Sequence, residues 1–501
     1  MTDLTTAVLT TADLTGNDDD ELKALGYTAQ FERSMSLWEN FALGFTYLSP
    51  VVGVYSVFSI GMAAAGPPMI WWYLIAAVGQ MIVCLTFCEV VSQFPISGGL
   101  YPWCRRLVGK KWAWMAGWVY GWALFTSIAA VSAGAAPYVG PLFGFHTTPV
   151  SAGLIAIGLV AFSTLTNLAG TRTLARVAMF GFVCEILGAI VVGAFLLLFH
   201  RHQHVAVIFN TYGLLKNGAY GPAFLGAAVV GLFTCYGFEA CGDVAEETPN
   251  PGVAIPKAMK STIYVGMSAS IFVALALILS LPDVMGVISG RVANPIEDAL
   301  NVAFGPIGAK AVVVVVLVSF LSCALSMQAA ASRLVYAYAR DDMVVASGWL
   351  SQVSKTHHVP MNALVLSGLI AAAILVLGMF FADAVATIVS FAVVGIYAGF
   401  QMVVIGATFA RARGWQPHGK FRLGAWGWPV NLAGIVWGVS AIVIMLRPTD
   451  GPMPWYASYG MALTFGAVIV SGLAYMLIGR PYDRSDAPAG DAWLRRAPGK
   501  A

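Results

Sequence analysis

The chain has 501 residues, of which 59% are hydrophobic and only 10% are charged, and its mean hydropathy is +0.78. Soluble globular domains are about 25% charged, so this composition excludes a soluble protein and indicates a polytopic membrane protein. The formal net charge is only +3, and we expect no nucleic-acid partner. The seven cysteines lie in or beside apolar runs without metal-ligand spacing. We therefore expect no disulfide framework, metal site or cofactor.

A polar, acidic segment precedes the first apolar run, and no charged-then-apolar signal peptide stands before it. We expect this segment to stay in the cytosol and the first span to act as its own insertion signal. Apolar runs of roughly 20 residues, long enough to cross a bilayer, follow at twelve places. They are 39–62, 67–91, 112–135, 149–168, 176–199, 221–247, 257–280, 308–336, 361–381, 384–409, 428–446 and 457–479.

The distribution of basic residues tests this count, because short cytoplasmic loops carry an excess of lysine and arginine. With twelve spans, 22 of the 27 lysines and arginines fall on the same side as the two termini. The other five are Arg201, Lys216, Arg291, Lys310 and Arg447. A missed or invented span would move the later charges to the wrong side. We therefore predict an all-α protein of the cell (inner or plasma) membrane with twelve spans and both termini cytoplasmic.

Two of the predicted spans are interrupted near their middle. In the first span, Pro50 removes a helical hydrogen bond and Gly53 permits unusual backbone angles. Five spans later, the run from Cys235 to Glu239 brings a glycine and a carboxylate into mid-span. A helix broken at membrane depth is tolerated only against other protein or a wet cavity. The alternative for either site alone is an ordinary kink.

Two breaks that stand first in successive groups of five spans indicate an inverted repeat with a binding site near the membrane midplane. Because five is odd, the two groups have opposite orientations. The predicted organisation is a cytosolic tail (1–38), a first repeat of five spans (39–199), an outer loop with the second repeat (200–410), two further spans (411–479) and a second cytosolic tail (480–501).

Three motifs resemble those of the amino acid–polyamine–organocation (APC) transporter superfamily, in its order and spacing. They are Phe94-Pro95 with Gly98-Gly99, Tyr101 and Trp103; Gly237-Phe238-Glu239 with Ala245-Glu246-Glu247-Thr248, Asn250-Pro251, Ile255-Pro256 and Ala258; and Ser332-Arg333 with Tyr336-Ala337 and Ala339-Arg340-Asp341. The segments Leu25-Gly26-Tyr27 and Phe31-Glu32-Arg33 are most similar to the amino acid/choline transporter (ACT) branch. The resemblance implies the LeuT-type fold of five-plus-five inverted helices, and amino acids, choline or other amines as substrates.

The first break is the expected site for a substrate carboxylate. The outer half of the first span begins there, so its free N–H groups and its positive dipole end face the midplane. Such a helix start binds anions. We expect backbone donors from Val51, Val52 and Gly53, with the Ser49 hydroxyl nearby.

The sixth-span break is the expected site for a substrate ammonium group, because the outer half of that span ends there with unpaired carbonyls. The candidates are Phe233, Thr234, Tyr236 and Gly237. By resemblance, the Phe233 ring would cover the substrate, where it could also attract a quaternary amine through its π face. The alternative is that this ring packs in the core or against lipid.

Glu185 and Glu239 are carboxylates within predicted spans, where a charge is costly and by default functional. Glu185 has no charged neighbour in sequence and is a candidate proton carrier; its alternative role is a hydrogen bond to a neighbouring helix. Glu239 either titrates, pairs with a cationic substrate, or caps the broken helix. Sodium is the rival to a proton as coupling ion. It would need oxygens where the first and eighth spans meet, and serines there also mark ordinary helix packing. The candidate hydroxyls are Ser319, Ser322 and Ser326.

Glu246 and Glu247 end the inner half of the sixth span, where the negative dipole end disfavours them. Both therefore need cations, and four arginines lie on the same predicted side: Arg105, Arg106, Arg333 and Arg340. We expect a cytoplasmic gate in which at least one of the two acids pairs with Arg333 or Arg340 when the protein is open to the outside.

Two further groups of residues carry weaker signals. Glu89, near the inner end of the second span, is expected to brace the Gly98-Gly99 loop. The alternating residues His200, His202 and His204 have a spacing that can hold a metal, and we interpret them as ordinary loop histidines.

The sequence thus predicts a secondary active transporter that moves a small amino acid or related amine by alternating access, with a proton as the coupling ion. The alternatives with the same fold are a choline, ethanolamine or polyamine transporter and an amino acid exchanger. A membrane nutrient sensor fits poorly because the tails are short, and an enzyme because no nucleophile with its base is evident. The substrate, the ion, the direction of transport and the oligomeric state stay open.

Overall fold

The structure is a computed structural model of the chain, and it describes residues 11–145, 147–215, 218–292, 294–380, 384–448 and 454–493. Several residues of the predicted topology lie outside these ranges. They are residues 1–10, Lys216, and residues 494–501 with Arg495, Arg496 and Lys500.

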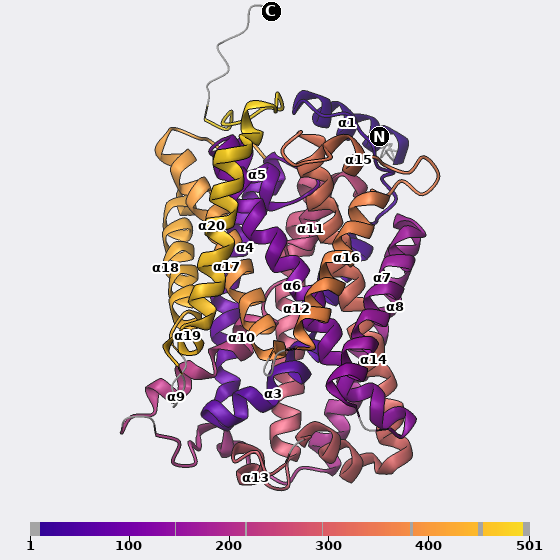
Figure 1. The fold of residues 1–501 in the computed structure, drawn as a ribbon, viewed down its shortest axis with the longest axis vertical. Coiled ribbons are helices and arrows are strands. Elements are labelled where there is room, and N and C mark those ends of the chain that lie inside the picture. Colours follow the sequence, from indigo (N-terminus) through magenta and orange to yellow (C-terminus); the bar gives the residue numbers. More distant parts are fainter. Residues whose placement is uncertain are drawn as a thin grey trace, which may run out of the picture.

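The described chain is all-α, and eleven of its helices are long and apolar enough to cross a membrane, so this is a multi-pass membrane protein. Most run along the long axis of the molecule (Figure 1). The eleven are Leu37–Ala65, Pro67–Gln93, Lys110–Gly140, Pro149–Leu168, Thr171–Phe199, Pro251–Ser280, Pro295–Arg340, Met361–Gly378, Thr387–Ala412, Gly424–Met445 and Gly460–Gly479.

The remaining predicted span, 221–247, is a series of short pieces. These are α9 (Gly221–Gly226), α10 (Ala228–Thr234), α11 (Ala240–Asp243) and a 3₁₀ turn (Ala245–Glu247). The first span is also divided, into α2 (Leu37–Leu48) and α3 (Pro50–Ala65), which meet at Ser49. Both helix breaks are therefore confirmed, whereas the count of twelve spans stays a prediction.

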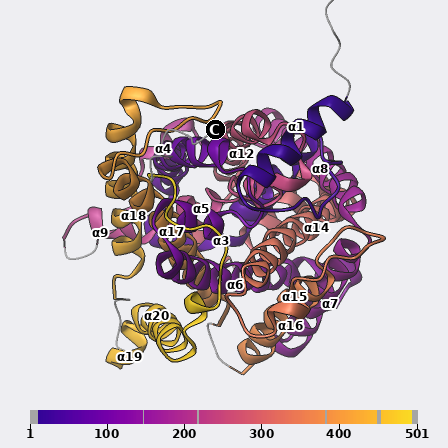
Figure 2. The ribbon, with the colours of Figure 1, turned by 90° about the horizontal axis from the view of Figure 1, so that it is seen from above.

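The helices differ in how much protein surrounds them. Viewed from above, α3, α5 (Leu100–Leu107), α6 (Lys110–Phe143) and α17 (Ala384–Ala412) lie centrally, while α18 (Gly427–Met445) and α20 (Gly460–Gly479) lie at the edge (Figure 2). The most apolar part of α6 is 83% buried and that of α20 only 11%. Apolar side chains on the outer helices therefore face the bilayer rather than a protein core.

The other helices complete the bundle around the two broken ones. They are α4 (Trp71–Gln93), α7 (Pro149–Leu168), α8 (Thr171–Phe199), α12 (Pro251–Ser280), α14 (Pro295–Arg340) and α16 (Met361–Gly378). The longest, α14, has a kink at Gly305, whose φ of +67° is not helical. Both α12 and α14 pack against α2, and α10 packs against α3.

The segments before α2 and after α20 meet at one end of the molecule, which is at the top of Figure 1. We call it the tail end; it carries α1 (Thr11–Ala24) and residues 480–493. Arg106 joins the two segments, because it donates to the Leu25 carbonyl (2.9 Å) and forms an ion pair with Asp491 (3.0 Å).

Candidate functional site

The first helix break is built around Ser49. This residue has a φ of +44°, unusual for a side chain with a Cβ, and Pro50 follows it at the first position of α3, where a missing N–H costs nothing. The Ser49 hydroxyl accepts from the Val52 N–H (3.3 Å), and the Ser49 carbonyl accepts from the Gly53 N–H (2.8 Å).

Glu185 of α8 occupies the start of α3. Its Oε1 accepts from the Ser49 hydroxyl (2.7 Å) and from the Val51 N–H (2.9 Å). Its side chain is fully buried, and its Oε2 has no hydrogen-bond partner among the described residues. The N–H groups expected to bind a substrate carboxylate are thus already bound to groups of the protein. Glu185 makes the interhelical hydrogen bond that was the alternative to its role as a proton carrier.

Glu239 stabilises the second break through its hydrogen bonds. The chain leaves α10 at Thr234 and turns at Gly237, whose φ is +110°. The Glu239 Oε2 accepts from the Gly237 N–H (2.8 Å), and its Oε1 accepts from the Tyr120 hydroxyl (3.3 Å). The side chain therefore bonds a backbone group freed by the break, which is the geometry of the capping interpretation.

The two breaks touch each other at Gly237. An ideal Cβ on this glycine would lie 2.6 Å from the backbone nitrogen of Leu48. Only a residue without a side chain allows this approach, and it also provides the positive φ. Nearby, a Cβ on Gly53 would lie 2.5 Å from a Thr234 side-chain carbon. Helices α3 and α10 are therefore packed as closely as the two breaks are at Gly237.

A cavity of about 10 Å³ lies between the breaks, which is close to the size of one water molecule. The predicted residues Val52, Gly53, Phe233 and Tyr236 contribute to its lining. The others are Tyr47, Leu48, Val131, Cys323 and Met327. The lining is mostly apolar and aromatic, so its polar groups are the backbone of the breaks and the hydroxyls of Tyr47 and Tyr236, which have no hydrogen-bond partner among the described residues.

Carbonyl groups without a donor in the described chain lie at the end of α10, where Phe233 lines this cavity. Thr234 closes α10, and no N–H or hydroxyl in the described ranges donates to the carbonyl of Phe233 or of Thr234. The Thr234 hydroxyl itself donates to the Val230 carbonyl (2.8 Å). The Tyr236 ring packs edge to face against the rings of Phe233 and Tyr47, with centroids 5.8 and 6.0 Å apart.

The serines of α14 differ in their contacts. The Ser326 hydroxyl lies 2.8 Å from that of Thr46 in α2, so it joins the two helices between which a sodium site was considered. The hydroxyls of Ser322 and Ser319 donate to carbonyls one turn earlier in their own helix, Val318 (2.9 Å) and Val315 (3.1 Å). These last two contacts match the packing alternative.

Four of the predicted gate residues meet at the tail end, where both acids are buried. Glu247 is bound by Arg333 through Nε (2.9 Å) and Nη2 (3.0 Å), and it also accepts from the Thr171 hydroxyl (2.6 Å). Glu246 is bound by Arg340 (2.8 Å). Two parallel N–H···O contacts make the Arg333 pair strong and geometrically specific.

Similarity to known proteins identifies the family to which this chain belongs. Residues 35–473 match the sequence profile of the family described as "Amino acid permease". The chain belongs to this family. Because such permeases are transporters, it is not an enzyme.

Three similar permeases align over nearly the whole chain. "Amino-acid permease BAT1" of Arabidopsis thaliana is 26% identical over 479 residues, which are 90% of this chain and 92% of the relative. Its homolog in Oryza sativa is also 26% identical, over 91% and 92% of the two chains. "Amino-acid permease 2" of Neurospora crassa is 24% identical, over 93% and 89%.

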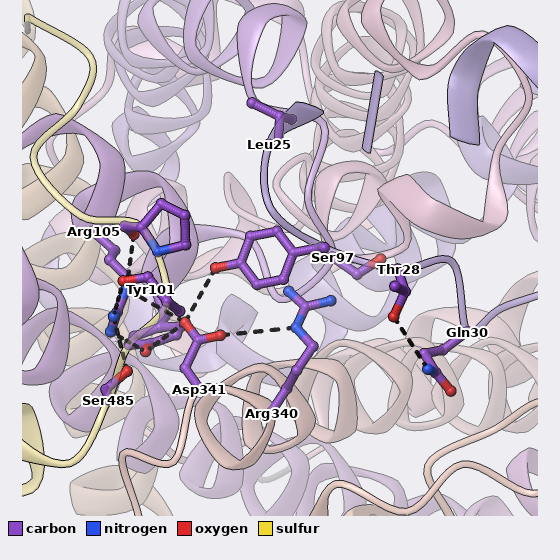
Figure 3. A network of polar contacts seen from close by, with 12 residues as sticks. Leu25, Thr28, Gln30, Ser97, Tyr101, Arg105, Arg340, Asp341 and Ser485 are labelled. Atoms are coloured by element: carbon purple, nitrogen blue, oxygen red, sulfur yellow. Dashed lines mark hydrogen bonds and ion pairs between the residues drawn. The ribbon is translucent and has the colours of Figure 1, made fainter. Parts of the chain in front are cut away.

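Asp341 of the permease is contacted by several donors at the tail end (Figure 3). Its Oδ2 accepts from the hydroxyls of Tyr101 (2.9 Å) and Tyr27 (3.3 Å), and Arg105 Nε lies 3.6 Å away. Arg105 also donates to the Ser485 hydroxyl (2.8 Å). Burial and the charge of Asp341 raise the pKa of Tyr27 and Tyr101 well above their usual range, so both hydroxyls stay protonated donors at neutral pH.

One expectation is wrong. Glu89 does not contact the Gly98-Gly99 loop; it forms an ion pair with Arg411 of α17 and accepts from the Leu423 N–H (2.8 Å). Two other acids contact that loop: Glu246 accepts from the Ser97 N–H (3.1 Å), and a Cβ on Gly99 would lie 2.3 Å from the Asp243 Oδ1. Asp341 appeared in the sequence only as part of a motif and Asp243 was given no role, because neither had a sequence neighbour that suggested a partner.

Proposed function

We propose that the permease is a secondary active transporter that moves a small amino acid or related amine by alternating access around the two helix breaks. The observation that carries this proposal is the contact of the breaks at Gly237 and Leu48, beside a small cavity lined by both. The cavity is too small for an amino acid, so binding requires the breaks to separate. The family membership and the relatives named as amino-acid permeases support the same substrate class.

The proposal includes the finer topology. It places twelve spans in the cell (inner or plasma) membrane as a LeuT-type fold, with repeats at 39–199 and 200–410, two further spans at 411–479, and cytosolic tails at 1–38 and 480–501. The shared end of the two tail segments supports a common side for both termini. The proposed substrate contacts are the backbone of Val51, Val52, Gly53, Phe233, Thr234, Tyr236 and Gly237, together with the Ser49 hydroxyl and the Phe233 ring.

Thermal stabilisation by candidate substrates tests this function. A ligand that binds only the folded protein at about 100 times its Kd stabilises it by about 2.7 kcal/mol, which raises Tm. We expect at least one amino acid in a panel of amino acids and amines to do so. The panel is measured with and without sodium and at two pH values. A panel in which no member changes Tm, and none is taken up by proteoliposomes, contradicts the proposal.

One observation favours a second candidate, an amine without a carboxyl group. Glu185 already bonds the start of α3, so a substrate such as choline, ethanolamine or a polyamine would need only the free carbonyls of Phe233 and Thr234. Carboxyl-less analogues separate the two candidates in a competition assay. If they displace the bound substrate as well as the amino acid does, the anion site is not used.

We further propose that a proton drives uptake and that Glu185 carries it. The carboxyl group sits at the break itself, and its Oε2 has no partner among the described residues. In proteoliposomes, we expect Glu185→Gln to lower uptake driven by a pH gradient by about tenfold or more, because an amide binds no proton. Exchange across the membrane without a gradient should persist.

The exposed acid Asp298 provides the matched control for this variant. Asp298→Asn should keep gradient-driven uptake at the wild-type level. Full gradient-driven uptake in Glu185→Gln would refute the role of Glu185, and uptake that needs sodium would favour the site between Thr46 and Ser326 instead.

A further inference from the structure

The inner part of the second broken helix buries four carboxyl groups within nine residues: Glu239, Asp243, Glu246 and Glu247. Two of them have cations, because Arg333 binds Glu247 and Arg340 binds Glu246. Glu239 has none, but it accepts hydrogen bonds from the Gly237 N–H and the Tyr120 hydroxyl. That leaves Asp243.

Asp243 is fully buried, and neither of its carboxyl oxygens has a hydrogen-bond partner among the described residues. Its side chain lies against the loop before α5, since a Cβ on Gly99 would come within 2.3 Å of Oδ1. Its backbone carbonyl accepts from the Gly98 N–H (3.1 Å), so the loop and α11 are joined directly.

The groups that face Asp243 come from each element packed around it. Glu239 stands one turn earlier on its own segment, and Tyr120 of α6 lies beside both acids. Arg333 of α14 is the cation that faces it. Its Nε and Nη2 bind Glu247, and its Nη1 donates to the Ser332 hydroxyl (3.1 Å). No group in this part of the described chain is free to neutralise a negative Asp243.

A carboxylate buried with neither a cation nor a donor costs several kcal/mol, and proteins avoid that cost by neutralising the group. We propose that Asp243 is a proton-binding site of the transport cycle. It holds a proton while the tail end is closed and gives that proton to water when this end opens. The inference rests on the proposed alternating access, with the tail end facing the cytosol.

The packing of the loop links the proton to the opening. Gly98 is wedged against α14, because a Cβ on it would lie 2.4 Å from the Ala337 Cβ and 3.0 Å from the Arg333 carbonyl. Separating α11 from α14 therefore moves the loop that covers Asp243 and lets water reach the carboxyl group. Since opening releases a proton, a rise in pH favours the open state and a fall in pH favours the closed one.

Hydrogen–deuterium exchange of the full-length protein, without substrate, tests this link. The readout is the exchange rate of peptides covering residues 94–107, with labelling times corrected for the intrinsic effect of pH on exchange. In the wild type we expect about tenfold faster exchange at about pH 8 than at about pH 6. Asp243→Asn should exchange slowly at both values, because its amide stays neutral. Asp342→Asn, a change of an exposed aspartate at the same end, should behave as wild type.

Two results would overturn the proposal: an Asp243→Asn profile that keeps the wild-type pH dependence, or a wild-type profile that has none. If Asp243→Asn does not fold, Asp243→Ser serves, since it also removes the charge and must also give a pH-independent rate. Because no substrate is present, the outcome is independent of whether amino acids bind. A Tm panel without any ligand effect would count against the proposed function and leave this measurement valid.

Discussion

Replacing Arg333 with alanine is expected to destabilise the protein by about 3–5 kcal/mol, because removing one partner of a buried ion pair leaves the other charge uncompensated. Arg333 and Glu247 are both 0% exposed, and two N–H···O contacts of 2.9 and 3.0 Å join them. The alanine variant retains the Thr171 hydrogen bond to Glu247 but no cation. The effect is measured by thermal unfolding in detergent, with the loss of the monodisperse size-exclusion peak as the readout.

The exposed pair of Arg172 and Glu32 provides the control, since their side chains are 68% and 41% exposed. Arg172→Ala should change stability by only about 0–1 kcal/mol, as exposed ion pairs do. Equal Tm losses in the two variants would mean that the buried Arg333–Glu247 pair contributes no more to stability than the exposed Arg172–Glu32 pair. The double variant Arg333→Ala with Glu247→Ala should recover part of the loss, because no unpaired charge remains.

Replacing Gly237 with alanine is expected to lower transport by about tenfold or more, because small displacements of a site's contacts have such effects. A side chain at φ +110° is strained by about 1–3 kcal/mol, and its Cβ would lie 2.6 Å from the Leu48 nitrogen and 3.0 Å from the Tyr47 carbonyl carbon. The backbone must move, which forces the two breaks apart. Initial uptake rates per folded molecule, with Tm measured in parallel, separate the loss of transport from the loss of stability.

Gly226 provides the matched control in the preceding helix, α9. A Cβ there would meet only the Ala64 Cβ, at an ordinary 3.7 Å. Gly226→Ala should therefore leave transport unchanged and stability the same or slightly higher, as alanine favours a helix. Normal uptake by Gly237→Ala would show that the close contact between the breaks is not needed for transport.

The sequence was most informative about the backbone of the site. Proline and glycine act locally, so Pro50 and Gly237 predicted where two helices end before any contact was known. The charge patterns were informative for a similar reason: acids at the negative end of a helix need cations, and both predicted arginines bind them. The family was recognisable from the short motifs around these residues.

Contacts between distant residues were not predictable in the same way. Glu185 lies 134 residues from Val51, and nothing in either segment indicates that they meet. Cys323 and Met327 are four residues apart and share a face of α14, but nothing in the sequence indicated that this face lines the cavity. Glu89 was assigned to the wrong partner because its position near the end of a span suited both the Gly98-Gly99 loop and Arg411.

The shared tail end also has a consequence for biosynthesis. Arg105 donates to the carbonyls of Ala487 (2.6 Å) and Pro488 (3.0 Å), and the second of these residues lies 383 positions later in the chain. During synthesis, most of the bundle enters the membrane before these partners exist. Until then, among the described residues, Arg105 has only Tyr101 and Asp341 as partners, and its Nε and Nη2 lack their carbonyl acceptors, which is unfavourable for a buried guanidinium. Contacts across so long a separation also form late. The ribosome must therefore add residues 485–492 before this end of the molecule can close, which makes its closure a late step of folding.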